Sequence, residues 1–98
     1  MKNNIADILK KIGLPKEGTF QNGFYVIELE DSNTYAKVYT LLDERAINTE
    51  YPNFGTNTNK ATVKVTNYFE VEEEGITYNI FLIADFKNGR YYVKIGEQ

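Results

Sequence analysis

The sequence predicts an α+β fold in which a short N-terminal helix packs on a curved, five-stranded antiparallel sheet that either stays open or closes toward a barrel. Three features predict it. One short segment has apolar residues at helical spacing, later segments have apolar residues in strand-length or alternating runs, and clusters of Asn, Asp and Gly separate them. The 98 residues suffice for one modest core, so we expect a single domain that spans residues 1–98.

The helix is predicted at residues 5–12. Asn4 is a good N-cap, and apolar residues recur at i, i+3, i+4 and i+7 from Ile5 to Ile12. Gly13 can take the left-handed conformation that ends a helix, and Pro15 prevents its continuation. Because so short a helix is unstable alone, we expect it to pack on the sheet.

The first two strands are predicted at residues 24–30 and 34–42, with a short loop between them. The expected register pairs Ile27 with Val38 on the core side and Glu28 with Lys37 on the reverse side, where opposite charges stabilise the pair. Residues 43–60 follow without helix or strand periodicity and are rich in Asn and Thr. A long loop in a small domain often carries function, and the alternative is that its aromatic residues cap the core.

The third strand is predicted at residues 61–71, where inward and outward residues alternate most regularly. Asn67 is the polar exception on the inward row, and a buried amide there needs a hydrogen-bond partner. Residues 72–75 turn the chain, so that Val71 lies opposite Ile76 in the expected register.

The fourth and fifth strands form a hairpin around Asn88-Gly89, a pair that supplies the two positive-φ positions of a type I′ turn. This turn places Phe86 opposite Tyr91 and Leu82 opposite Ile95, all on the core side. The reverse side of the same hairpin is only half polar, and this is the unusual feature of the sequence.

The composition excludes most familiar catalytic systems. The chain has no histidine and no cysteine, so Ser-His-Asp and Cys-His nucleophiles and His/Cys zinc sites cannot form. Ser32, the only serine, lies in a predicted turn without a base nearby. The acidic run at residues 70–74 lacks the spaced oxygen ligands of a calcium loop. We therefore expect a protein that is not an enzyme and that needs no cofactor or metal.

Charge and hydropathy indicate where the protein works and what it binds. A net charge of −3 is the wrong sign for a protein that binds nucleic acid through phosphate neutralisation. There is neither an apolar run long enough to span a membrane nor a signal peptide, so we expect a cytoplasmic protein. Lys outnumbers Arg nine to two, which is typical of AT-rich genomes such as those of low-GC bacteria, their phages and mobile elements.

The candidate binding surface is the reverse face of the predicted sheet, where tyrosines alternate with lysines. Aromatic residues of this kind are enriched at protein interfaces. The candidate partner-binding residues on this face are Tyr35, Lys37, Tyr39, Leu41, Tyr68, Phe81, Ile83, Tyr92 and Lys94, joined by Tyr51 and Phe54 from residues 43–60.

Three interpretations of this face remain open. It could form a second core layer, a surface for a protein partner or a second copy of the chain, or a platform on which bases of single-stranded nucleic acid stack. The function that we expect is a non-enzymatic interaction module, an inhibitor or accessory protein that binds a protein partner. The alternatives are a nucleotide or single-stranded nucleic-acid binder and a self-associating structural protein.

Overall fold

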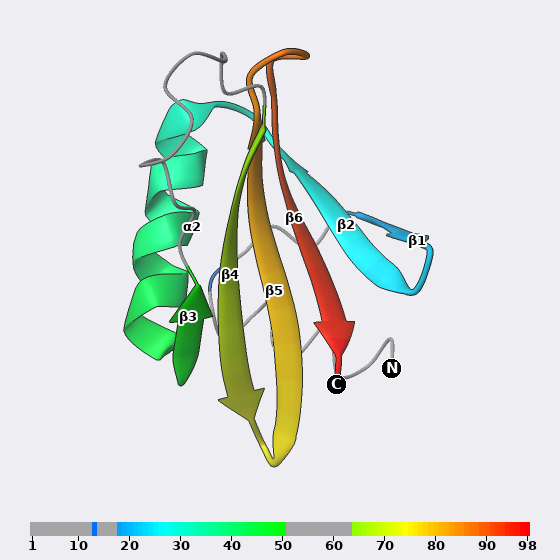
Figure 1. Ribbon diagram of the computed structural model, residues 1–98, viewed down its shortest axis with the longest axis vertical. Coiled ribbons are helices and arrows are strands. Elements are labelled where there is room, and N and C mark those ends of the chain that lie inside the picture. Colours follow the sequence, from blue (N-terminus) through cyan, green and yellow to red (C-terminus); the bar gives the residue numbers. More distant parts are fainter. Residues whose placement is uncertain (1–12, 14–17, 51–63) are drawn as a thin grey trace.

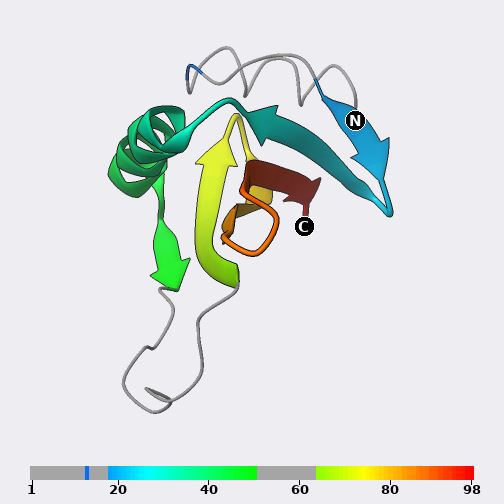
Figure 2. The same cartoon turned by 90° about the horizontal axis from the view of Figure 1, so that it is seen from above.

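The computed structural model describes Gly13 and residues 18–50 and 64–98, which form one helix packed on a six-stranded antiparallel sheet (Figure 1). The elements along the chain are β1 (Thr19–Gln21), β2 (Phe24–Leu29), α2 (Ser32–Arg45), β3 (Asn48–Glu50), β4 (Lys64–Glu73), β5 (Ile76–Asp85) and β6 (Arg90–Glu97). The strand order is β1-β2-β6-β5-β4-β3, so β1 and β3 are the two edges and the sheet is open. Figure 2 shows how strongly this sheet curves, with α2 on one side of it.

The predicted α+β class is confirmed, but the sheet has six strands where five were predicted and it does not close into a barrel. The helix expected at residues 5–12 lies outside the described residues, but Gly13 does adopt the left-handed conformation, with φ of 88°. β1 was not predicted, and it pairs with β2 through a two-residue turn at Asn22-Gly23 in which both φ values are positive. β3 was not predicted either, since residues 43–60 carry no strand periodicity.

The strand predicted at residues 34–42 is wrong, because this segment forms the middle of α2. Asp31 is the N-cap, and its carboxylate accepts hydrogen bonds from the backbone N of Thr34 at 2.8 Å and from its hydroxyl at 2.9 Å. Val38 and Leu42, four residues apart, are the buried residues of the helix. The expected pairing of Ile27 with Val38 is therefore replaced by packing between β2 and α2 and by pairing of β2 with β6.

The β4–β5 hairpin has its turn at Glu74-Gly75, where φ values of 53° and 79° match a type I′ turn. Val71 consequently pairs with Tyr78, two residues beyond the predicted Ile76. A displacement of two residues keeps each side chain on its predicted face, since side chains alternate with a period of two.

The β5–β6 hairpin differs from its predicted register by the same number of residues. Asp85 pairs with Arg90, four residues connect the strands, and only Gly89 among them has positive φ, so the type I′ turn predicted at Asn88-Gly89 is wrong. The Asp85 carboxylate determines the loop geometry, because it accepts hydrogen bonds from the backbone N of Asn88 at 3.2 Å and from its side-chain Nδ2 at 2.9 Å. Phe86, expected in the core, is 54% exposed in this loop.

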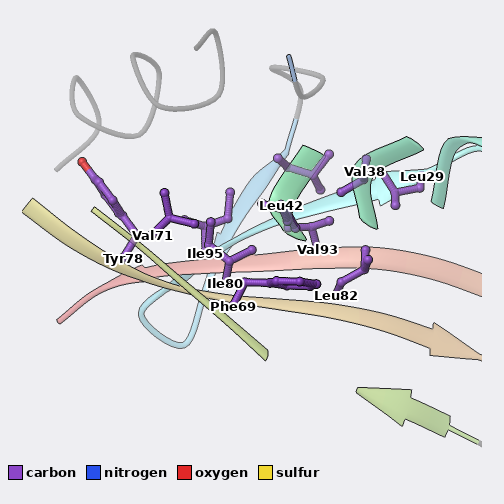
Figure 3. Close-up of a cluster of buried hydrophobic side chains, with 11 residues drawn as sticks. Leu29, Val38, Leu42, Phe69, Val71, Tyr78, Ile80, Leu82, Val93 and Ile95 are labelled. Carbon is purple, nitrogen blue, oxygen red and sulfur yellow. The ribbon is translucent and has the colours of Figure 1, made fainter. Parts of the chain in front are cut away.

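The main core lies between α2 and the sheet (Figure 3). Its buried members are Ile27, Leu29, Val38, Leu42, Phe69, Val71, Tyr78, Ile80, Leu82, Val93 and Ile95. Asn67 is buried on the same side with 6% of its surface exposed, and its Nδ2 donates to Oη of Tyr35 at 2.9 Å. The helix thus supplies the partner that the buried amide requires, and burial raises the pKa of the Tyr35 hydroxyl, which stays protonated.

Candidate functional site

The sheet face directed away from α2, which we call the reverse face, holds part of the predicted site. Phe81 on β5 lies opposite Tyr68 on β4 and Lys94 on β6, and Ile83 lies opposite Tyr92. Strand alternation places these five predicted residues on one face. Among the described residues no helix lies over it (Figure 2).

Four other predicted residues are not part of this face, which corrects the prediction of one shared surface. Tyr35, Lys37, Tyr39 and Leu41 all lie on α2. The Tyr39 ring packs edge-on against Phe69, 5.6 Å away, so it contributes to the main core. Tyr51 and Phe54 lie outside the described residues.

Two residues of β2 belong to the reverse face and were not predicted as site residues. Val26 is buried together with Ile83 and Tyr92, and Phe24 and Phe81 pack against these three as half-buried neighbours. Phe24, Val26 and Glu28 alternate along a predicted strand, and this alternation is the sequence pattern that could have placed Phe24 and Val26 on the reverse face. Part of the face is therefore a small second cluster, and the aromatic residues at its border keep some ring area at the surface.

Three rings form what we call the aromatic row: Phe24, Phe81 and Tyr68. The centroids of Phe24 and Phe81 are 5.8 Å apart with planes at 80°, and those of Phe81 and Tyr68 are 5.2 Å apart at 46°. Such tilted and edge-to-face contacts are favourable ring geometries. The row therefore crosses from β2 to β4, although β6 lies between β2 and β5.

Gly96 on β6 makes this crossing possible. A Cβ at this position would lie 3.0 Å from both Cδ1 and Cε1 of the Phe24 ring, closer than side chains normally approach. The backbone of Gly96 is buried beneath that ring. The absence of a side chain there lets Phe24 reach Phe81 across the strand.

Hydrogen bonds fix the other end of the row. Oη of Tyr68 donates to Oδ1 of Asn79 at 2.5 Å, and the same oxygen accepts from Nε2 of Gln98 at 2.9 Å. Nε2 of Gln98 also donates to Oε2 of Glu70, and its backbone N donates to the carbonyl of Thr77 at 2.9 Å. These bonds determine the direction in which the Tyr68 ring lies.

Two cations lie over aromatic rings of the face. Nζ of Lys94 is 4.7 Å from the centroid of Phe24, and Cζ of Arg90 is 4.6 Å from that of Tyr92. Arg90 also forms a bidentate ion pair with Glu28, with Nε–Oε1 at 3.0 Å and Nη2–Oε2 at 2.7 Å. The hydrogen bonds to Glu28 raise the pKa of Arg90, so its charge is permanent.

Neither a metal-ligand cluster nor a membrane-spanning helix is found in the described part of the chain. In residues 18–50 and 64–98 no three acidic, histidine or cysteine side chains gather closely enough to hold a metal ion. No helix in the described part of the chain has the length and apolar character required to cross a bilayer. Comparisons with protein-family models, with curated proteins and with solved structures return no match for this chain.

Proposed function

We propose that this protein is a non-enzymatic interaction module that binds a protein partner through the aromatic row, as a cytoplasmic inhibitor or accessory protein. The observation that carries the proposal is a set of three adjacent rings, Phe24, Phe81 and Tyr68, half-buried and fixed in mutual contact on one sheet face. Rings held in place before binding lose little conformational entropy in a complex, and aromatic side chains are enriched at protein interfaces.

The ring geometry favours a protein partner over single-stranded nucleic acid. A base stacks on an open ring face, but the faces of Phe24 and Tyr92 carry the cations of Lys94 and Arg90. The planes of Phe81 and Tyr68 are inclined by 46° and do not form a flat platform. The net charge of −3 also opposes binding to phosphates.

The proposal can be tested by placing a long charged side chain in the middle of the reverse face. Thr66 is exposed and lies opposite Ile83, so Thr66→Arg adds bulk and charge beside the aromatic row at small cost to folding. Thr40→Arg is the matched control, because Thr40 is exposed on α2, on the other side of the sheet. Both variants add the same side chain and the same charge.

The assay is capture of a partner from the native host, followed by calorimetry with that partner in purified form. Thr66→Arg should weaken binding at least about tenfold, which corresponds to about 1.4 kcal/mol, and Thr40→Arg should leave it unchanged. Equal affinities for the two variants would contradict the proposal.

Two further measurements separate the alternative functions. Sedimentation of the isolated protein tests self-association, which Thr66→Arg would abolish if a second copy were the partner. Titration with single-stranded oligonucleotides at low and high salt tests nucleic-acid binding, which weakens steeply with salt when phosphates supply the affinity. Salt-sensitive oligonucleotide binding would replace the proposed function.

A further inference from the structure

A small hollow adjoins the aromatic row between the β1–β2 turn and β6. Its volume is about 150 Å³, and the residues that line it are Gln21, Asn22, Val26, Arg90, Tyr92 and Lys94. Two of these residues are cations, two carry amides, and Val26 and Tyr92 supply an apolar base. Since a water molecule occupies about 30 Å³ in the liquid, the hollow has room for a small polar group.

The cations around the hollow are not fully compensated by carboxylates. Glu28 accepts from Nε and Nη2 of Arg90, and Nη1 of the guanidinium has no carboxylate partner among the residues that the structure describes. Lys94 makes its cation–π contact with Phe24, and within the described part of the chain no carboxylate lies within ion-pair distance of its ammonium.

The charge around the hollow is positive, in contrast to the chain as a whole. Arg90 and Lys94 contribute +2, and Glu28, the ion-pair partner of Arg90, contributes −1, so these three side chains sum to +1. A single monoanion balances this charge. A phosphate dianion would leave a net negative site in a protein that is already acidic.

We propose that the hollow receives one carboxylate group of the protein partner, from an aspartate or glutamate that stands beside an apolar residue in the partner's sequence. The ammonium of Lys94 and the free Nη1 of Arg90 bind the carboxylate, and the apolar neighbour contacts the aromatic row. Lys94 links the two parts, because it lines the hollow and lies over the ring of Phe24. This inference rests on the proposed function and specifies the partner's chemistry at the same surface.

The test uses two blocked dipeptides that differ only in charge: acetyl-glutamyl-leucine amide and its glutaminyl isostere. Each is titrated into the ¹⁵N-labelled protein at about 0.05 M ionic strength, where screening is limited. The backbone amide signals of Asn22 and Lys94 follow the hollow, and those of Tyr68 and Phe81 follow the aromatic row. The variants are Lys94→Met and, as a control of equal charge change on the same face, Lys64→Met.

We expect the glutamyl peptide to bind about fivefold more tightly than the glutaminyl peptide, a ratio at the upper end for one partly exposed ion pair. Lys94→Met should lower this ratio to about twofold, because Nη1 of Arg90 remains, and Lys64→Met should preserve most of it. Inorganic phosphate at the same ionic strength should shift the signals of Asn22 and Lys94 no more than acetate does.

Several outcomes would overturn the inference. Equal affinity for the two peptides, an unchanged ratio in Lys94→Met, or stronger binding of phosphate than of acetate each excludes a carboxylate site in the hollow. If both peptides shift Tyr68 and Phe81 equally, the inference fails and the proposed function stands. If neither peptide shifts any of these signals, both the hollow and the aromatic row fail as binding surfaces for such segments.

Discussion

Replacement of Gly96 by alanine should destabilise the fold by displacing Phe24. The added Cβ would lie 3.0 Å from two carbons of the Phe24 ring, whereas carbon atoms pack at about 3.5–4.0 Å, so the ring must move by roughly half an ångström or more. Overpacking of this kind costs about 1–3 kcal/mol, and the loss of glycine's freedom in the unfolded chain offsets about 0.4–1 kcal/mol. Because the half-buried Phe24 ring can shift outward, we expect a net loss of about 1 kcal/mol.

The assay is thermal and urea denaturation of four proteins: wild type, Gly96→Ala, Phe24→Leu and the double variant. A loss of about 1 kcal/mol lowers the melting temperature by roughly 4–8 °C in a domain of this size. In the Phe24→Leu background the alanine should be neutral or stabilising, because leucine does not extend over position 96 as the ring does. An equal cost of Gly96→Ala in both backgrounds would refute the view that Phe24 lies over Gly96, since residues in contact are the ones whose effects fail to add.

Three further changes test other parts of the structure. Tyr35→Phe removes the hydroxyl that accepts from Asn67 and should cost about 1–3 kcal/mol in urea melts, but almost nothing when Asn67→Val is already present. Leu82→Ala should cost about 2–5 kcal/mol and the exposed Thr66→Ala almost nothing, and similar losses for the two would contradict the assignment of faces. The hydrogen bonds from Asn88 lower the pKa of Asp85, so their stabilising effect is present above the pKa of the unfolded chain and is lost as pH falls through the lower folded value. Melts below about pH 4 should therefore show a smaller pH dependence for Asp85→Asn than for wild type.

The sequence predicts faces better than it predicts elements or registers. The inward rows of β4, β5 and β6 are confirmed even though both of their hairpins are displaced by two residues. The alternation of apolar residues determines which face is buried, and an even displacement preserves it. The loop length depends instead on one side chain, the Asp85 carboxylate, whose bonds to Asn88 could not be inferred from the Asn-Gly pattern.

The helix α2 was missed because its sequence satisfies two periods at once. Tyr35, Lys37, Tyr39 and Leu41 suggest strand alternation, whereas Tyr35, Val38 and Leu42 recur at helical spacing. The predicted strands place Asp31 in the loop between them, although it is the N-cap of α2 and favours the helix. A short segment with both periods is settled by such a cap and by packing against the sheet.

The sequence predicts the part of the candidate site that depends on alternation within a strand, but not the part that depends on which strands pair. Tyr68, Phe81, Ile83, Tyr92 and Lys94 share a face because each lies on a correctly identified strand. The role of Phe24 depends on the pairing of β2 with β6, which brings together residues about 70 positions apart. The prediction paired β2 with a strand at residues 34–42, which is helical in the structure. The wrong assignment of this segment therefore hid the pairing of β2 with β6 and the contact between Gly96 and Phe24.

The short strands at the two edges of the sheet limit how copies of this protein can associate. β1 and β3 have three residues each, whereas the apolar β5 has ten and lies between two other strands. An edge strand recruits a foreign strand through its outward-pointing backbone groups, and a three-residue strand offers too few of them to act as a template. The long apolar β5 is thus enclosed by β6 and β4, which must detach before it can be reached. Orderly association of folded copies would therefore proceed face to face, and fibril growth would have to begin from partly unfolded chains.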